Sequence, residues 1–231
     1  MTFPADYPGA ITDFHVNPSG YGYTTNGVAL VNKPKAIVLH TPEETADDYE
    51  STPPYFATQG VEAGTHYYGD NDGDIYQMLE ESECPYANGN RGGVNRTWKG
   101  QVDQWPPWAT AGVTLNGQTL SIELEGRAAT IGQTWTDKQH DSLVAWIKHR
   151  AAHYGIPLDR DHIIGHFEVA TDRTDPGSTF PWDRLMRDLQ EDDMPIDITK
   201  VRIVPLSTDV RWTDKPDERE IVQRVQIVVD P

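Results

Sequence analysis

The chain has 231 residues, of which 37% are hydrophobic and 24% charged, a composition typical of a globular protein rather than a disordered or fibrous one. Its 36 acidic residues outnumber 19 basic residues and give a net charge of −17, and no cluster of lysines and arginines offers the basic surface that nucleic-acid binding needs. The apolar runs are too short for a transmembrane helix, so we expect no membrane insertion.

Two further features limit the setting and the chemistry. No basic residue precedes Lys33, so we expect no secretory signal peptide, because such peptides begin with a basic region. The single cysteine, Cys84, excludes an intramolecular disulfide and a zinc site built from cysteine pairs. We interpret Cys84 as an inert thiol, and any metal must be bound by His, Asp or Glu side chains.

The first elements are predicted from turn residues and short apolar runs. Residues 1–33 are rich in Gly, Pro, Tyr and Asn and predict an N-terminal arm. The apolar run at 36–39 predicts a buried strand that ends at His40. A short helix is expected over about 54–59, because prolines suit a first helical turn.

An Asp-Gly turn between two β-rich runs, 65–68 and 75–79, predicts a hairpin. Four carboxylates fall at positions 1, 3, 5 and 12 of a calcium-binding loop: Asp70, Asp72, Asp74 and Glu81. The sixth position of such a loop requires glycine for its sharp bend, whereas this chain has Ile75. Calcium binding is therefore a poor match, and a simple turn is the favoured interpretation.

Residues 84–118 form a long stretch rich in Gly, Pro and Trp. Trp98, Trp105 and Trp108 argue against disorder. They either pack the stretch onto the body or form an aromatic wall of a substrate groove. Packing is favoured, since aromatic side chains mostly supply buried area.

The next elements follow from periodicity. Residues 119–125 alternate, so Glu123 and Glu125 share the face opposite the leucines and isoleucine, and solvent exposure is their simplest interpretation. A helix is predicted over 136–154, because Thr136 can cap it and Gly155 can end it. A short strand at 163–164 ends near His166.

Toward the C-terminus, a short helix is predicted from 181–182 to about 189. Residues 190–195 resemble a linker, and two β-rich runs follow at 201–204 and 221–229. The predicted organisation is an arm over 1–33, a main domain over 34–190 and a β-rich extension over 191–231.

Three residues stand out as candidates for chemistry. His40 and His166 each end a predicted strand, and Asp175 follows nine residues after His166. The carboxyl ends of strands gather functional groups in α/β proteins, and two imidazoles with one carboxylate are a ligand set for catalytic zinc. Each residue also has an ordinary interpretation, a hydrogen-bonded structural histidine or a turn aspartate. Position alone leaves both interpretations open.

In order and spacing, the sequence resembles the type 2 N-acetylmuramoyl-L-alanine amidases, which share a fold with the peptidoglycan recognition proteins. The resemblance covers about residues 34–190. The pieces that carry it are Val38-Leu39-His40-Thr41, Ile122-Glu123-Leu124-Glu125-Gly126, Gly165-His166, Thr174-Asp175-Pro176-Gly177 and Phe180-Pro181-Trp182. It implies an α/β fold, in which a mixed central β-sheet flanked by helices carries an open groove containing zinc.

The resemblance also implies a site and a reaction. Zn²⁺ would be bound by His40, His166 and Asp175, and the amide between N-acetylmuramic acid and L-alanine of peptidoglycan would be cleaved. Glu123 stands where the family carries the glutamate that acts on the attacking water. Arg173 stands where the family often has lysine, so it can stabilise an oxyanion but cannot donate a proton at neutral pH.

Three further positions are expected to bind substrate by the same resemblance: Thr65, Asn88 and Trp182. Thr65 occupies a position where some members carry a catalytic tyrosine, which places this chain in the branch that relies on the glutamate. Asn88 lies in a stretch that aligns with a Trp-His-Ala-Gly-like segment, but the histidine of that segment is missing here. His66 is interpreted as structural.

The favoured function is that of a bacteriophage endolysin, a monomer held in the cytoplasm of the infected host before its release to the cell wall. One alternative is a cytoplasmic amidase that recycles muropeptides. Another is a peptidoglycan-binding module without catalysis, although such modules typically lose a zinc ligand and all three are present here. The 191–231 extension is a wall-binding or oligomerisation element or packs on the catalytic domain, the last being favoured.

Overall fold

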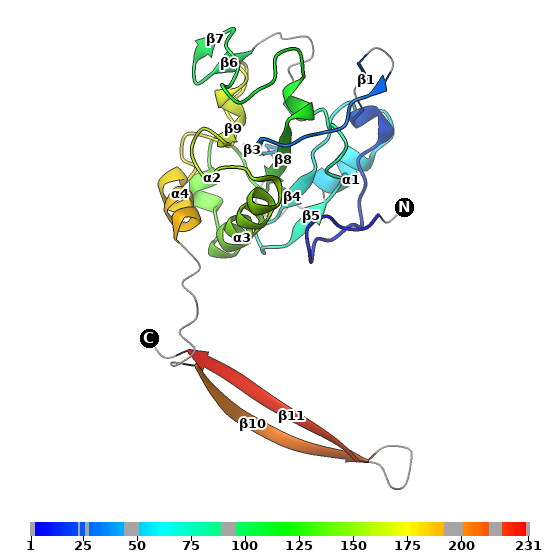
Figure 1. The fold of residues 1–231 in the computed structure, drawn as a ribbon, viewed down its shortest axis with the longest axis vertical. Helices are drawn as coiled ribbons and strands as arrows, with labels where there is room; N and C mark the ends of the chain where they lie inside the picture. The colour runs from blue at the N-terminus through cyan, green and yellow to red at the C-terminus, as the bar shows by residue number, and fades with distance from the viewer. Residues whose placement is uncertain are drawn as a thin grey trace. The chain divides into compact units, whose positions relative to one another are not determined.

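A computed structural model describes residues 3–22, 24–25, 28–43, 51–88, 96–191, 201–212 and 219–229. The chain divides into two compact units, Met1–Gln190 and Glu191–Pro231, each of which we describe by itself (Figure 1). The helices of the first unit are η1 (Pro18–Gly20), α1 (Thr52–Ala57), η3 (Leu115–Gly117), α2 (Ile131–Thr134), α3 (Asp137–Tyr154), η4 (His166–Glu168) and α4 (Trp182–Gln190). Its strands are β1 (Thr24–Thr25), β2 (Val28–Ala29), β3 (Ala36–His40), β4 (Tyr67–Gly69), β5 (Ile75–Gln77), β6 (Thr97–Trp98), β7 (Gln101–Val102), β8 (Thr119–Leu124) and β9 (Ile163–Gly165).

The central sheet has five strands in the order β5-β4-β8-β3-β9. The strands β4, β8, β3 and β9 run parallel, and β5 pairs antiparallel with β4 through the predicted hairpin. Parallel strands need long connections, and the helices and loops between them supply these. The expected mixed sheet flanked by helices is therefore confirmed.

Helix α3 covers one face of this sheet, with α4 packed beside it (Figure 1). It begins where predicted, because Thr136 Oγ1 accepts a hydrogen bond from the Gln139 amide at 3.0 Å, and it ends at Gly155 with a φ of 68°. Leu143, Trp146 and Ile147 of α3 share one apolar cluster with alternate residues of the strands. These strand residues are Ile37, Leu39, Tyr67, Leu120, Ile122, Leu124 and Ile163.

The opposite face packs against loops and the N-terminal residues. Val38 and Ile164 form a cluster against which Trp98, Trp105 and Trp108 pack, so these tryptophans hold the loop onto the sheet. This confirms the packing interpretation. No tryptophan of this loop lines either of the two cavities described below.

The N-terminal residues predicted as an arm pack closely against β5. The Asp6 carboxylate accepts hydrogen bonds from the Gln77 side chain at 2.5 Å and the Glu81 amide at 3.0 Å. Ile11 bridges Tyr76, and further along Val16 is fully buried. Residues 3–22 therefore belong to the same compact unit as the sheet.

The acidic hairpin does not gather its carboxylates around one point. Asp70 accepts the amides of Asp72 and Asp74, both at 2.9 Å, which is the hydrogen bonding of an Asx turn. Glu81 instead forms a buried ion pair with Arg150. Within the part of the chain that the structure describes, these carboxylates form no metal cluster, and the turn interpretation is confirmed.

One sequence expectation about β8 is wrong. Glu125 is not solvent-exposed but only 1% accessible, and its Oε2 accepts the Asn71 amide at 2.8 Å. The physical reason is that Glu125 lies just beyond the strand, where the hairpin loop folds over it.

The second unit contains an antiparallel ribbon of β10 (Val201–Trp212) and β11 (Arg219–Val229), with an irregularity between Pro205 and Ser207. The first β-rich run, predicted at 201–204, is the start of the longer strand β10. The second, predicted at 221–229, lies within β11. Across the described residues, no helix is both long and apolar enough to cross a membrane.

Candidate active site and metal centre

The parallel strands bring distant residues together at their carboxyl ends. His40 is the last residue of β3, and its register partner on β8 is Glu123. Leu39 pairs in the same way with Gly165, the residue before His166. Since Leu39 faces α3 and side chains alternate along a strand, His40 and Glu123 point to the other face of the sheet.

Three polar atoms converge there. The Nδ1 atoms of His40 and His166 lie 3.0 Å apart, and each lies close to Asp175 Oδ2, at 3.2 and 3.1 Å respectively. Asp175 reaches this point because the Phe167 amide donates to its carbonyl oxygen at 3.1 Å, which ties the loop after η4 to the turn that carries His166. All three predicted ligands are buried.

The triangle fits a tetrahedral metal ion. A zinc ion with bonds of about 2.0–2.1 Å has ligand atoms about 3.3–3.4 Å apart, close to the three separations observed. Among the described residues, these three are the group that could hold a metal. All three also line a cavity, from which a water or a substrate oxygen could reach a metal held by them.

The protonation states also suit a metal. Burial, with His166 nearby, lowers the pKa of His40 to about 4, so its imidazole is neutral at pH 7 and has a lone pair to offer. Burial opposes ionisation of Asp175, but hydrogen bonds from the two imidazoles outweigh it and hold the pKa of this carboxyl below its usual range. His40 therefore offers a neutral imidazole and Asp175 a carboxylate to a metal.

A cavity of about 520 Å³ opens over the triangle and brings the other predicted catalytic residues to it. Glu123 and Arg173 line it together with the three candidate ligands. The Arg173 side chain is 44% exposed, and its Nη1 lies 3.4 Å from the Asp172 carboxylate, so its guanidinium is accessible from solvent. All five residues predicted for metal binding and catalysis therefore surround one cavity.

A second cavity of about 770 Å³ adjoins the first, because Glu43, Arg173 and Thr174 line both. Trp182 and Phe167 form its aromatic wall. Trp182 was expected from the sequence to bind substrate, and it lines this neighbouring cavity. Phe167 was missed, although its place directly after a candidate ligand is a usable signal.

The other two residues expected to bind substrate lie elsewhere. Thr65 is fully buried, and its hydroxyl donates to Ser121 Oγ at 3.2 Å. Asn88 is 1% exposed and donates through Nδ2 to Thr119 Oγ1 at 3.0 Å. Neither residue is among the lining of the two cavities, but Tyr86 and Ala87, from the same stretch as Asn88, line the first.

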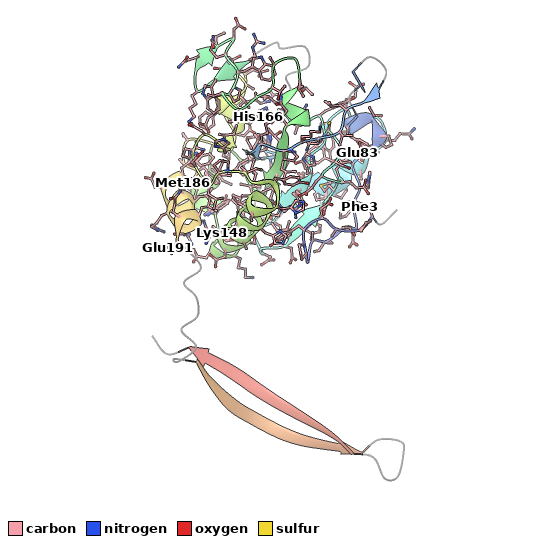
Figure 2. The ribbon with its side chains drawn as sticks, viewed as in Figure 1. Phe3, Glu83, Lys148, His166, Met186 and Glu191 are labelled. Atoms are coloured by element: carbon pink, nitrogen blue, oxygen red, sulfur yellow. The ribbon has the colours of Figure 1, made fainter. Side chains whose placement is uncertain are left out.

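His66 is a fully buried residue outside the lining of both cavities; Figure 2 labels His166 of the candidate site in the same unit. The Nδ1 of His66 lies 3.1 Å from Ser121 Oγ and its Nε2 3.1 Å from the Glu83 carbonyl oxygen. Burial lowers the pKa of His66 to about 4, which keeps the ring neutral. This matches its interpretation from the sequence.

Comparison with known proteins adds independent observations. The family model of N-acetylmuramoyl-L-alanine amidase matches residues 30–178. A crystal structure of a selenomethionine AmpD derivative is similar over 82% of this chain and 99% of its own, with 20% identity and a TM-score of 0.54. The catalytic domain of XlyA is similar over 78% of this chain and 98% of its own, with 19% identity and a TM-score of 0.52.

No curated protein matches the chain. The two solved structures share its fold. The family model covers more than half of the chain, including all five residues predicted for metal binding and catalysis. The chain therefore belongs to the N-acetylmuramoyl-L-alanine amidase family and is an amidase that acts on peptidoglycan.

Proposed function

We propose that this amidase is a zinc enzyme that hydrolyses the amide between the lactyl group of N-acetylmuramic acid and L-alanine. The observation that carries the proposal is the buried triangle of His40, His166 and Asp175, with sides of 3.0–3.2 Å, in a cavity that Glu123 also lines. Bound to these residues, zinc would polarise a carbonyl and lower the pKa of a water to about 7.

Glu123 acts as the general base in this proposal. It extends from the same face of the sheet as His40, one strand away in register, and its carboxylate borders the cavity in which water and the amide would meet. It takes a proton from the attacking water and returns it to the leaving amine of L-alanine. Such a carboxylate typically contributes about 10²–10⁴-fold to the rate.

Arg173 stabilises the negative charge that develops on the carbonyl oxygen. A guanidinium stays charged at every pH at which the enzyme folds, so it supplies positive charge but no proton. Arg173 lines both cavities, which supports a position between two parts of a bound substrate. The whole of the proton return therefore falls to Glu123.

We also propose that the enzyme acts on the intact wall, as a bacteriophage endolysin held in the host cytoplasm until lysis. The adjoining cavities of about 520 and 770 Å³ favour a substrate that extends to both sides of the scissile amide. A wall polymer, with a glycan on one side and a stem peptide on the other, is such a substrate.

Digestion of purified peptidoglycan sacculi tests both parts. Zinc-loaded protein should release stem peptides that begin with L-alanine, identified by mass spectrometry, and chelator-treated protein should not. Glu123→Gln should bind zinc but release at least about 10²-fold less peptide, whereas the exposed Glu80→Gln should match the parent. Zinc binding with no release from sacculi or soluble muropeptides would contradict the mechanism, and release from soluble muropeptides alone would contradict the endolysin role.

A further inference from the structure

His166 lacks the contact that usually orients a metal-binding histidine. Such a histidine normally donates its second ring nitrogen to a carboxylate or carbonyl, which fixes the ring. The Nε2 atom of His166 is buried and has no hydrogen-bond partner within the described part of the chain. Apart from its contacts with His40 and Asp175 inside the triangle, the orientation of His166 therefore depends on the backbone on which it stands.

That backbone is fixed by the carboxylate of Glu168. The side chain of Glu168 turns back from the end of η4, and its Oε2 accepts the Gly165 amide, directly before His166, at 2.8 Å. The residue is only 5% exposed, so water competes little for this bond. A buried carboxylate that accepts a backbone amide makes a strong, charge-assisted hydrogen bond.

The same carboxylate is itself held in place. Arg160 Nη2 donates to Glu168 Oε2 at 2.5 Å, and its Nη1 donates to the Ile163 carbonyl oxygen within β9. The Arg160 guanidinium also stacks on Trp182, 3.5 Å from the centre of the indole ring. Glu168 thus connects the strand before His166 to the aromatic wall of the second cavity.

The space around Gly165 leaves this turn little freedom. A Cβ atom on Gly165 would lie 2.7 Å from both a Phe167 ring atom and Pro176 Cδ. Pro176 directly follows Asp175, so the turn before one candidate ligand is packed against the loop of another. A shift of the η4 turn would therefore displace the triangle and not only His166.

We propose that Glu168 is a positioning residue that fixes His166 as a metal ligand. The inference rests on the proposed zinc site, and Glu168 itself touches neither metal nor substrate. It acts through the Gly165 amide, and Arg160 supports it from the other side.

The test is zinc affinity, measured in the full chain by competition with a chromophoric chelator. Glu168→Ala should weaken zinc binding about 10–100-fold, the usual effect of losing an outer contact to a metal ligand. Glu168→Gln should stay close to the parent, because its amide oxygen still accepts the Gly165 amide. Glu168→Asp should lose affinity, because the shorter side chain does not reach.

Glu125→Ala is the matched control, because Glu125 is also a buried carboxylate that accepts a backbone amide, but away from the metal. It should lower the melting temperature and leave zinc affinity unchanged. The absorption spectrum of the cobalt-substituted protein gives a second readout, and it should change for Glu168→Ala but not for Glu125→Ala. A purely structural role for Glu168 would change neither zinc affinity nor this spectrum.

The outcomes separate this inference from the proposed function. Parent protein that binds no zinc would overturn both. Parent protein that binds zinc, together with Glu168→Ala at equal affinity, would overturn the positioning role alone. If Glu168→Ala does not fold, the comparison of Glu168→Asp with Glu168→Gln decides, because equal zinc affinity of these two variants would contradict the proposal.

Discussion

The two faces of the central sheet use the same strands for different purposes. On the face toward α3, alternate residues such as Leu39 and Ile122 are completely buried in one apolar cluster. On the other face, their immediate neighbours His40 and Glu123 reach a cavity. The difference lies in single residues along one backbone, so each strand contributes to stability and to chemistry at adjacent positions.

This arrangement explains how a polar site persists inside a folded domain. Apolar burial drives folding, and it comes from both faces: the strand residues that face α3, and Val38 and Ile164 with the loop tryptophans on the other face. The polar side chains of the site stand only where the strands end, so they replace little of this burial. Substitutions of the polar residues at the strand ends should therefore abolish activity with little loss of stability, and substitutions of the apolar residues that face α3 should do the reverse.

The largest effect is expected on the site face itself. Asp175→Ala removes one corner of the triangle and leaves two buried imidazoles without their carboxylate. Amidase activity should fall by at least about 10³-fold, because both carbonyl polarisation and water activation depend on the bound metal. Isothermal titration with zinc and the sacculus assay measure this, and retained stoichiometric zinc with normal activity would exclude Asp175 as a ligand.

The next effect separates two adjacent residues of β8. Glu123→Gln should lower kcat by about 10²–10⁴-fold at nearly unchanged melting temperature. Its neighbour Ile122, buried in the α3 cluster, gives the opposite result: Ile122→Ala should cost about 2–5 kcal/mol of unfolding free energy. Its kcat per folded molecule should stay at the parent value. If both variants lost activity and stability together, the division between the faces would be wrong.

A smaller effect concerns the pH dependence of stability. Burial holds the pKa of His66 at about 4, below the value of 6.5 of an exposed histidine, so below pH 6.5 the unfolded chain takes up a proton that the folded chain does not. The stability that depends on neutral His66 should be full above pH 6.5 and fall by about 3 kcal/mol as the pH drops to 4. Buried His40, whose pKa is also lowered to about 4, adds a loss of the same sign in the metal-free protein.

Urea unfolding of the metal-free protein at several pH values measures this loss. His66→Gln should make the curve less steep between pH 6.5 and 4 and leave the part that His40 contributes, and His153→Gln, which changes an exposed histidine, should leave the curve unchanged. Parallel curves for His66→Gln and the parent would show that His66 does not supply the dependence.

The smallest effect is a difference in labelling rate, expected at Cys84, which lies outside the two apolar clusters described above. Its thiol is completely buried, donates to the Leu30 carbonyl oxygen at 3.3 Å, and has its pKa raised by burial to about 12. A disulfide reagent at pH 8 should therefore label the unfolded chain at once and the native chain only as fast as it opens. Rapid native labelling would contradict this burial.

Local sequence signals predicted the elements well. Thr136 and Gly155 mark the ends of α3 as expected, because capping depends on neighbouring residues alone. The positions of His40 and His166 after short apolar strands made them candidates, since parallel strands end at the same edge of the sheet. Their assignment with Asp175 to one metal site came from the resemblance to the amidase family and not from position alone.

Properties that depend on distant contacts could not be predicted in this way. Glu125 and Thr65 are buried because the hairpin loop and β8 close over them, and nothing in their own neighbourhoods indicates this. The role inferred for Glu168 needs the turn of η4, which brings its side chain back to the Gly165 amide. Such contacts appear only once the segments are placed in space.

The register between β3 and β8 also has a consequence for when activity can arise. His40 and His166 are separated by 126 positions in the chain, and Glu123 and Asp175 come from two further segments. Contacts between such distant segments form late and slowly during folding, because long loops must close first. A ribosome that has not yet released residue 175 holds a chain without its third ligand. In a refolding experiment, activity should therefore return only when the strands β3, β8 and β9 have paired. Its recovery should come later in time than the recovery of the helical signal from α3.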